Sequence, residues 1–495
     1  LMPPFSEKNG NIGNFDPTTG SVIIPDIAAK VLPPPAPYLY SINACSVSPL
    51  PNPAFPCTPV LTASQAHYPE WLRETYWKDF DPRIGVAWRP FGNDKTVFRA
   101  GWGIFTVPSL GWEAYMMTGT AYVNSPFYVN SFSNGQPAFR LPQVGFGNGA
   151  PSPSVVGTFY FNEGQDRYYR DPQSAQWNVT IEREFLNSWT ARGSYIGENS
   201  YRLPLGVDLN QCHASVSGPC VKPFPQFGKI GSFVNGAFSN YQGLELQISH
   251  RLAQGFYLQG TYDLAKDLSD AGDMPSGFGT ESGNGRVDDR FNLRNDRGND
   301  PGPRRQRFLF TGLYALPFGH GRPFLSNANR FVNGALGGWQ LSAILLDETG
   351  PFTTAYESNR AISVSNLNEV ARSATVRPDQ IGDCNLSNPT PNAWNNINAF
   401  IPTPQGAGRT GSEGVGNCIG PPTNTLSAGL SKNFAVWERL RMRFEATFTN
   451  VLNHPNFLQP TLNVSSPSTF GVTQTVQSAE NGGNRVGQLS LRLDF

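Results

Sequence analysis

Apolar and polar residues alternate one by one along much of the chain, and helical periodicity is nearly absent. In 81–90, for example, Ile84, Val86 and Trp88 share one face of a two-residue repeat. The alternation predicts about eleven strands, at 81–90, 95–105, 174–185, 188–198, 241–252, 255–266, 305–316, 337–348, 424–432, 439–451 and 485–495. Strands of roughly ten residues exceed the mean of about 5–6 in soluble proteins. They have the length that a tilted strand needs to cross a bilayer.

The connections between these strands alternate between short and long. The short ones lie near 91–94, 186–187, 253–254 and 433–438, and we place the intermediate connection 317–336 with them. The long ones are about 106–173, 199–240, 267–304, 349–423 and 452–484. Structureless loops of this size argue against a compact soluble domain. Short turns on one side and long loops on the other are typical of an outer-membrane barrel. The sequence therefore predicts an all-β, antiparallel transmembrane β-barrel with long external loops.

The two faces of the predicted strands suit lipid and water. In the last strand Leu489, Leu491 and Leu493 share a face with Phe495, whereas the other face is polar and carries Arg492. An arginine at the lipid midplane would cost about 2–4 kcal/mol, so the register is well specified. Trp and Tyr residues near strand ends suit interfacial girdles. They would fill a soluble core equally well, so by themselves they decide nothing.

Composition narrows the function classes. The chain has 37 basic and 37 acidic residues and a formal net charge of zero, so nothing indicates nucleic-acid binding. Charged residues make up 15% against roughly 25% in ordinary soluble domains. No run of 18 apolar residues occurs, which excludes a transmembrane helix but not a barrel, because transmembrane strands alternate.

Six cysteines fall into three pairs of sequence neighbours, each in a stretch rich in Gly, Pro, Asn and Ser. The pairs are Cys45 with Cys57, Cys212 with Cys220, and Cys384 with Cys418. Although six cysteines allow fifteen connectivities, this neighbourhood favours three loop disulfides formed in an oxidising compartment. Free surface thiols are the alternative.

No catalytic constellation is recognisable, so we expect neither an enzyme nor a cofactor. The five histidines are scattered, and we expect no metal site from them. The densest polar cluster, 286–307, contains Asp288, Asp289, Asp296 and Asp300 among several arginines. It is either an ion- or ligand-contacting external loop or a solvated loop neutralised by its own arginines. It lacks the closing Glu of a complete calcium loop.

Several runs together resemble the barrel of Oar-like TonB-dependent outer-membrane receptors, over nearly the whole chain. They are WKDFDPRIGVAWRPFGNDKTVFRAGWGIF, NYQGLELQISHRLAQGFYLQGTYDLAKDLSD, RRQRFLFTGLYALPFG, GGWQLSAILLDETGPFT and RFEATFTNVLNHPNF. The terminal LSLRLDF, with Leu489, Leu491, Leu493 and Phe495, resembles the signal that the outer-membrane barrel-assembly machinery reads in a last strand.

The resemblance implies a 22-stranded barrel filled by an N-terminal plug, often preceded by a small regulatory domain. Counting back from Phe495 gives eleven strands, half of the 22. Residues 81–495 therefore look like the C-terminal half of such a barrel. Residues 1–80 would then form an external region that precedes the first complete strand. We find no candidate plug, TonB box or regulatory domain in the chain, so the TonB energy-coupling complex would act through a part that lies upstream.

Two functions of different class follow. One is an outer-membrane receptor or transporter that binds an unknown external ligand and imports it with energy from the inner membrane. The other is a structural or adhesive surface protein whose barrel, embedded in outer-membrane lipid, anchors contact-making loops. A secreted soluble β-protein, such as a glycan-binding domain, is a weaker third hypothesis, which predicts no lipid-facing band.

Overall fold

The computed structural model describes residues 7–92, 95–107, 117, 132–133, 136–137, 156–157, 159–186, 188–211, 221–253, 255–270, 290–358, 375–404, 411–435, 440–478 and 482–494. No helix in this part of the chain is long and apolar enough to span a membrane.

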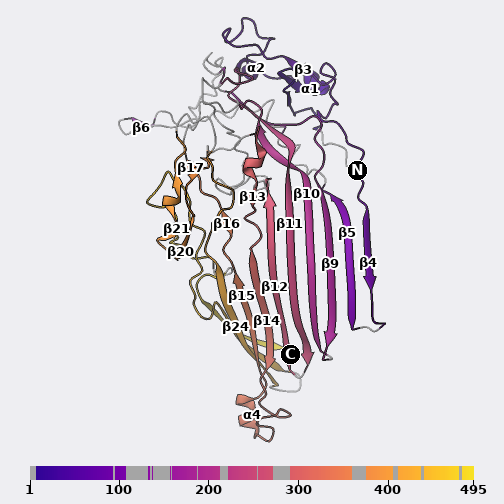
Figure 1. Cartoon of the computed structure of the whole chain (residues 1–495), viewed down its shortest axis with the longest axis vertical. Helices are drawn as coiled ribbons and strands as arrows, with labels where there is room; N and C mark the ends of the chain where they lie inside the picture. The colour runs from indigo at the N-terminus through magenta and orange to yellow at the C-terminus, as the bar shows by residue number, and fades with distance from the viewer. Residues whose placement is uncertain are drawn as a thin grey trace.

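Eleven strands form one antiparallel sheet in which each strand pairs with the next member of the series along the chain (Figure 1). They are β4 (Arg83–Trp88), β5 (Thr96–Thr106), β9 (Gln173–Phe185), β10 (Trp189–Asp208), β11 (Lys229–Ala253), β12 (Phe256–Ser269), β14 (Gln306–Ala315), β15 (Trp339–Glu348), β24 (Thr423–Ala435), β25 (Arg441–Thr449) and β26 (Val486–Asp494). The predicted set of strands is thereby confirmed.

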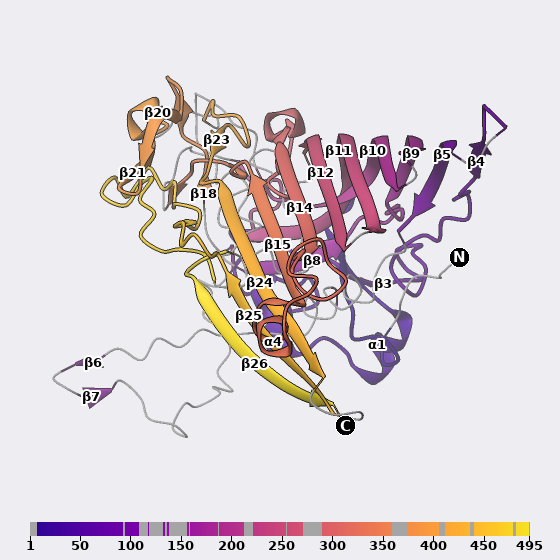
Figure 2. The same cartoon turned by 90° about the horizontal axis from the view of Figure 1, so that it is seen from below.

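The sheet is strongly curved and remains open. Seen from below, it bends round from β4 at one edge to β26 at the other (Figure 2). Within the described residues, β4 pairs only with β5 and β26 only with β25.

Short and long connections separate to opposite ends of the sheet (Figure 1). The connection between β14 and β15 contains the helix α4 (Arg330–Leu336) and lies at the end of the short turns, as we predicted. Asn329 begins this helix, because its side chain accepts hydrogen bonds from the backbone N–H groups of Phe331 and Val332. The N-terminal elements lie at the opposite end, with the long connections.

The prediction of a long loop at 199–240 is wrong. β10 continues to Asp208 and β11 begins at Lys229, so the two strands extend as a paired ribbon past the rest of the sheet. A bulge near Leu203 interrupts their register, and beyond it Val207 and Ile230 are buried. Because protein rather than lipid covers this ribbon, the simple alternation of lipid- and water-facing residues ends there. β8 (Tyr160–Gln165) pairs in parallel with the ribbon, and β13 (Gly298–Asn299) pairs with β12.

Two units with hydrophobic cores lie among the long connections. The N-terminal unit, residues 7–72, packs Phe15, Val22 and Ile42 against Phe227 and Ile230. Its elements are β1 (Asn14–Asp16), β2 (Ser21–Ile24), α1 (Asp26–Val31), α2 (Ala36–Ser41) and β3 (Val60–Thr62).

The second unit, which we call the β16–β23 unit, combines parts of the connections after β15 and β25. Its core includes Ala399, Phe400, Leu462 and Phe470. Its elements are β16 (Phe352–Thr353), β17 (Glu357–Ser358), β18 (Thr375–Val376), β19 (Asp379–Gln380), β20 (Asn385–Thr390), β21 (Ala393–Asn395), η3 (Ile397–Ala399), β22 (Phe400–Ile401) and β23 (Cys418–Ile419). Three short elements complete the list: β6 (Phe132–Ser133), β7 (Gln136–Pro137) and η2 (Leu293–Asp296).

Register gives the sheet one apolar and one polar face. Residues directly opposite each other in an antiparallel pair share a face, and Leu489 and Leu491 lie opposite Ala446 and Phe444. On the other face Ser490 lies opposite Glu445, and Arg492 lies opposite Arg443. The predicted division of these strands into an apolar and a polar face is confirmed.

Candidate functional site

A row of charged side chains of both signs crosses the polar face of the sheet. Four pairs lie directly opposite each other on neighbouring strands: Glu182–Arg192, the two carboxylates Glu245–Asp263, Asp263–Arg307 and Arg307–Glu348. Ion pairs link the row: Arg99 Nη1 lies 3.5 Å from Glu182 Oε2, Arg192 pairs with Glu245, and Arg307 Nη1 lies 3.6 Å from Asp263 Oδ2. We call Arg99, Glu182, Arg192, Glu245, Asp263, Arg307 and Glu348 the charged row.

The charged row is hydrated rather than buried. The side chains of Arg99 and Glu182 are 48% and 36% exposed, and those of Arg192 and Glu245 are 38% and 29% exposed. Exposed pairs of this kind contribute about 0–1 kcal/mol each to stability. The main effect of these ion pairs is therefore to keep this face of the sheet polar and hydrated, as the inner wall of a water-filled barrel must be.

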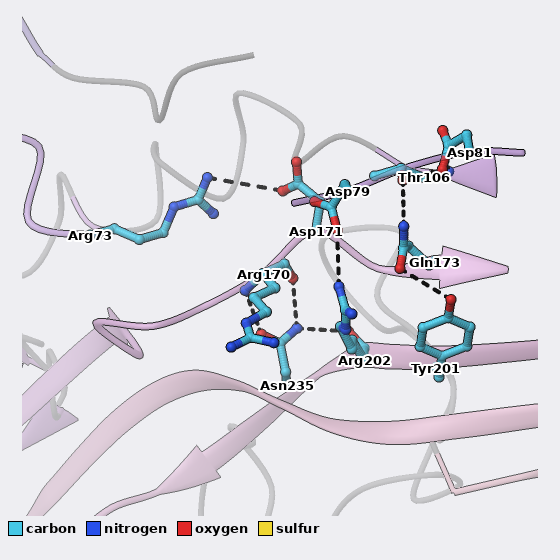
Figure 3. A network of polar contacts seen from close by, with 10 residues as sticks. All are labelled: Arg73, Asp79, Asp81, Thr106, Arg170, Asp171, Gln173, Tyr201, Arg202 and Asn235. Carbon is cyan, nitrogen blue, oxygen red and sulfur yellow. Dashed lines mark hydrogen bonds and ion pairs between the residues drawn. The ribbon is translucent and has the colours of Figure 1, made fainter. Parts of the chain in front are cut away.

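A second polar network lies at the rim, where the segment before β4 meets β5, β9, β10 and β11 (Figure 3). Asp81 accepts hydrogen bonds from the backbone N–H and the hydroxyl of Thr106, at 3.1 and 2.7 Å. Gln173 Nε2 donates to Thr106 Oγ1 at 3.0 Å, and Tyr201 donates its hydroxyl proton to Gln173 Oε1 at 3.1 Å. The network thus ties the chain that enters β4 to three strands at once.

Asn235 and Arg202 form the centre of this rim network. The left-handed backbone of Arg202, φ 58°, lies at the bulge in β10, and Asn235 Nδ2 donates to its carbonyl at 2.7 Å. Asn235 also bonds the backbone N–H and carbonyl of Arg170, at 2.6 and 2.8 Å. The bulge directs the Arg202 guanidinium outward from the strand, and Nη1 lies 3.0 Å from Asp79 Oδ1.

Arginines and tyrosines stack on one another beside this network. Arg170 lies over the ring of Tyr76, 4.3 Å from its centre, and Arg167 lies over Tyr68 at 4.4 Å. Burial raises the pKa of Tyr68 to about 12, although the Arg167 charge lowers it. Sequence reasoning missed this cluster. One signal in the sequence could have indicated it: charged and tyrosine residues are concentrated at 166–171 (DRYYRD), inside a predicted loop.

The sheet has one hydrated polar face and one apolar face, and its long connections gather at one end. These are the features of a barrel that spans an outer membrane. The family model of the outer membrane beta barrel domain matches residues 1–488. The chain belongs to this family. Its localisation is therefore the outer membrane. A comparison with curated proteins finds no match.

Solved structures similar to this outer-membrane barrel chain are transporters and receptors. The outer membrane transporter YddB from Escherichia coli is 9% identical, with a TM-score of 0.47, over 84% of this chain and 40% of that one. The FrpB iron transporter from Neisseria meningitidis is 10% identical, with a TM-score of 0.37, over 83% and 39%. The siderophore receptor PiuA from Acinetobacter baumannii is 8% identical, with a TM-score of 0.38, over 83% and 35%. The chain thus spans about two fifths or less of these proteins, and likeness at this level says nothing of ligand or activity.

The structure joins two of the three predicted cysteine pairs in this outer-membrane barrel chain. Cys45 bonds Cys57 in the N-terminal unit, and Cys384 bonds Cys418 in the β16–β23 unit. Both disulfides lie at the end of the long connections, as we predicted. Cys212 and Cys220 lie outside the described residues.

Of the four aspartates predicted in 286–307, the structure describes Asp296 and Asp300. Asp296 is buried against Arg377, whose Nη2 donates a hydrogen bond to Asp296 Oδ1 at 2.6 Å. Asp300 accepts a hydrogen bond from the backbone N–H of Gly302. Asp288 and Asp289 lie outside the described residues, and the described part of the chain contains no group of three or more potential metal ligands. Asp296 therefore joins two long connections of the barrel chain, and its role as an ion ligand stays a prediction.

The residues of the C-terminal signal lie on the last strand. Leu489, Leu491 and Leu493 are exposed on the apolar face of β26, at the open edge of the sheet. Phe495 lies outside the described residues. Recognition of this strand by the assembly machinery stays a prediction.

Proposed function

We propose that the protein is an outer-membrane receptor of the transporter type, which binds an external ligand and passes it inward. The charged row is the observation that carries this proposal. It extends from β5 to β15 on one face of the sheet, with most of its charges in contact with water. A lipid anchor needs an apolar outer face, but it does not need a charged, hydrated inner wall. A passage for a polar solute needs both. The role that we propose is binding and translocation, not catalysis.

We also propose that further strands complete the barrel. Unpaired backbone N–H and C=O groups at an open sheet edge cannot face hydrocarbon, because each unsatisfied group costs several kcal/mol there. β4 and β26 both present such an edge within the described residues. Eleven strands fit one half of the 22-stranded barrel that the Oar-like resemblance implies, so residues 81–495 would form its C-terminal half.

The orientation that we propose follows from the two ends of the sheet. In outer-membrane barrels short turns face the periplasm and long loops face outward. Residues 7–80 lie at the end of the long connections, which supports our expectation that residues 1–80 form an external region (Figure 1). The rim network of Figure 3 would then lie at the external end of the barrel.

Energy coupling through TonB, a plug upstream and insertion by the barrel-assembly machinery belong to the same proposal. They rest on the sequence runs that resemble Oar-like receptors. The ligand is left open, because no cluster of described side chains selects one chemical class.

An adhesive surface protein is the second candidate, and one observation favours it. The β16–β23 unit has a hydrophobic core and a disulfide of its own, and the N-terminal unit contains a disulfide and packs its core against Phe227 and Ile230. Long connections that fold into stable units present defined surfaces, which contact with a partner requires and a simple pore does not.

Uptake by living cells distinguishes the two functions. Cells with and without the gene are given a uniformly ¹³C-labelled nutrient mixture, and periplasmic extracts are compared by mass spectrometry, with and without a proton uncoupler. A transporter predicts at least one labelled compound that requires both the gene and the proton gradient. The variant Arg192→Glu should reduce its uptake, and the exchanged pair Arg192→Glu with Glu245→Arg should restore it. Identical extracts together with loss of cell attachment would establish the adhesive function instead.

A further inference from the structure

The apolar face of the sheet is interrupted by a groove of about 730 Å³ that crosses β9, β10, β11, β12 and β14. Almost all of its exposed lining is apolar. Small residues form part of its floor: Ala191 and Gly193 on β10 and Gly260 on β12 lie on either side of Ile248 and Leu246 of β11. Ile181 and Phe310, directly opposite Gly193 and Gly260, form its walls.

Glycine is not required by the backbone at the two floor positions. A Cβ atom at Gly193 would lie 3.6 Å from Leu246 Cδ2, and one at Gly260 would lie 3.6 Å from Ile248 Cγ2. Both distances are ordinary van der Waals contacts, and neither glycine has a positive φ. The groove is therefore open because side chains are missing there, and larger side chains could fill it without moving the backbone.

A continuous row of rings locates the membrane interface beside this groove. Phe185, Trp189, His250, Phe256 and Tyr314 lie on five successive strands, at the end of the short turns. Neighbouring ring centres are 6.4, 4.8, 5.2 and 6.1 Å apart. Such aromatic girdles mark the level of the lipid headgroups. The groove begins at Trp189 and runs from this level toward the middle of the membrane.

Arg183 lies where the groove meets the girdle. It is directly opposite Ala191 on the groove floor and two residues from Phe185 in the ring row. Its side chain is exposed on the apolar face and makes no hydrogen bond or ion pair with any described residue. A lone guanidinium at the edge of the hydrocarbon is costly unless it reaches an anion at headgroup level. Phosphate is the anion that phospholipid headgroups carry at this level, and two parallel N–H groups of an arginine can bond two of its oxygens.

We propose that this groove is a specific site for one phospholipid of the leaflet at the short-turn end. An acyl chain lies in the groove, and the Arg183 guanidinium donates hydrogen bonds to the lipid phosphate. The site lies on the opposite face of the sheet from the charged row, so this inference is independent of the proposed transport.

Native mass spectrometry of the protein, purified from outer membranes and delipidated in mild detergent, tests the site. The probes are dioleoylphosphatidylglycerol, dioleoylglycerol without the phosphate, and inorganic phosphate. We expect one tightly held phosphatidylglycerol. Arg183→Gln should weaken it about tenfold or more, the loss expected for a charge-assisted hydrogen-bond pair, while the weaker binding of dioleoylglycerol stays unchanged. Gly260→Leu should abolish both by filling the groove.

Two variants control for folding and for charge. Arg251 lies near the same turn, but its guanidinium pairs with Glu184 and does not face the groove. The variant Arg251→Gln should therefore bind phosphatidylglycerol like the wild type. Gly193→Leu fills the groove at a second position, in case Gly260→Leu fails to fold. Unchanged phosphatidylglycerol binding by Arg183→Gln and by a folded groove-filling variant would refute the site. Complete displacement of the lipid by inorganic phosphate would also refute it, because the groove would then contribute nothing.

Discussion

Leu246→Arg is the substitution that most directly tests which face of the sheet contacts lipid. Leu246 lies on the apolar face, directly opposite Gly193 and Tyr262, and its side chain is 46% exposed. It is four residues from His250 in the ring row. That separation is about 13 Å along a strand at about 3.3 Å per residue. With a tilt of about 40° it places Leu246 about 10 Å above the girdle, near the middle of a band about 25 Å tall.

An arginine at that depth costs about 2–4 kcal/mol. At about 1.4 kcal/mol for each factor of ten, the folding equilibrium constant in lipid should fall about 30- to 700-fold. Gln247→Arg places the same charge on the polar face, directly opposite Arg192 and Thr261. Like charges on opposing strands cost about 0.2–1 kcal/mol, so the control should lose no more than about fivefold.

The assay is urea unfolding of the protein reconstituted in phospholipid vesicles, followed by the mobility of unboiled samples on SDS gels. We expect a clearly lower midpoint for Leu246→Arg than for Gln247→Arg, which should stay close to the wild type. Equal midpoints for the two variants, or a lower one for Gln247→Arg, would show that the assignment of the faces is wrong.

Three further predictions concern the long connections. Burial raises the pKa of Asp208, so the folded state holds this proton to higher pH than the unfolded state does. Stability at the rim should therefore rise as pH falls from neutral toward the ordinary value of 3.8. Hydrogen exchange at the Ile230 amide, which donates to Asp208, should follow this trend, and Asp208→Asn, which keeps the acceptor oxygen, should flatten it. Replacing Cys384 by Ser opens a disulfide with a sequence separation of 34, which should destabilise the β16–β23 unit by about 3–4 kcal/mol. Limited proteolysis should cut the β16–β23 unit first and leave the sheet intact. Cleavage of the unit and the sheet at the same rate would show that the unit does not unfold separately from the sheet. Arg377→Met leaves Asp296 buried without its cation and should cost about 3–5 kcal/mol. Hydrogen exchange should then accelerate in both of the long connections that the Arg377–Asp296 ion pair joins. Acceleration in only one of them would contradict the proposal that this ion pair holds the two together.

The strands of the sheet were predictable because their environment imposes a local pattern. A residue such as Leu491 must face lipid, and its neighbour Arg492 must not, so alternation appears in the sequence wherever a strand crosses the membrane. The ribbon formed by β10 and β11 beyond Ser200 lacks that constraint. Val207 and Ile230 are covered there by other parts of the chain, so the alternation ends and the sequence resembles a loop.

The candidate sites differ in the same way. The disulfides of Cys45 with Cys57 and of Cys384 with Cys418 join sequence neighbours, so proximity along the chain was enough to predict them. Asp296 and Arg377 are 81 residues apart, and no local pattern connects them. The aspartates of 286–307 looked like a cluster because they are close in sequence, whereas Asp296 folds toward a partner from another connection.

The sequence by itself determined the number of strands, their order along the chain and the residues that face lipid, because each of these depends on neighbours one or two positions away. Only the tertiary structure decided which distant side chains meet. The charged row, the rim around Arg202 and the groove over Gly193 and Gly260 each combine residues from several strands. Their existence depends on the register between those strands, and across the long connections it is backbone pairing, not the connecting sequence, that sets this register.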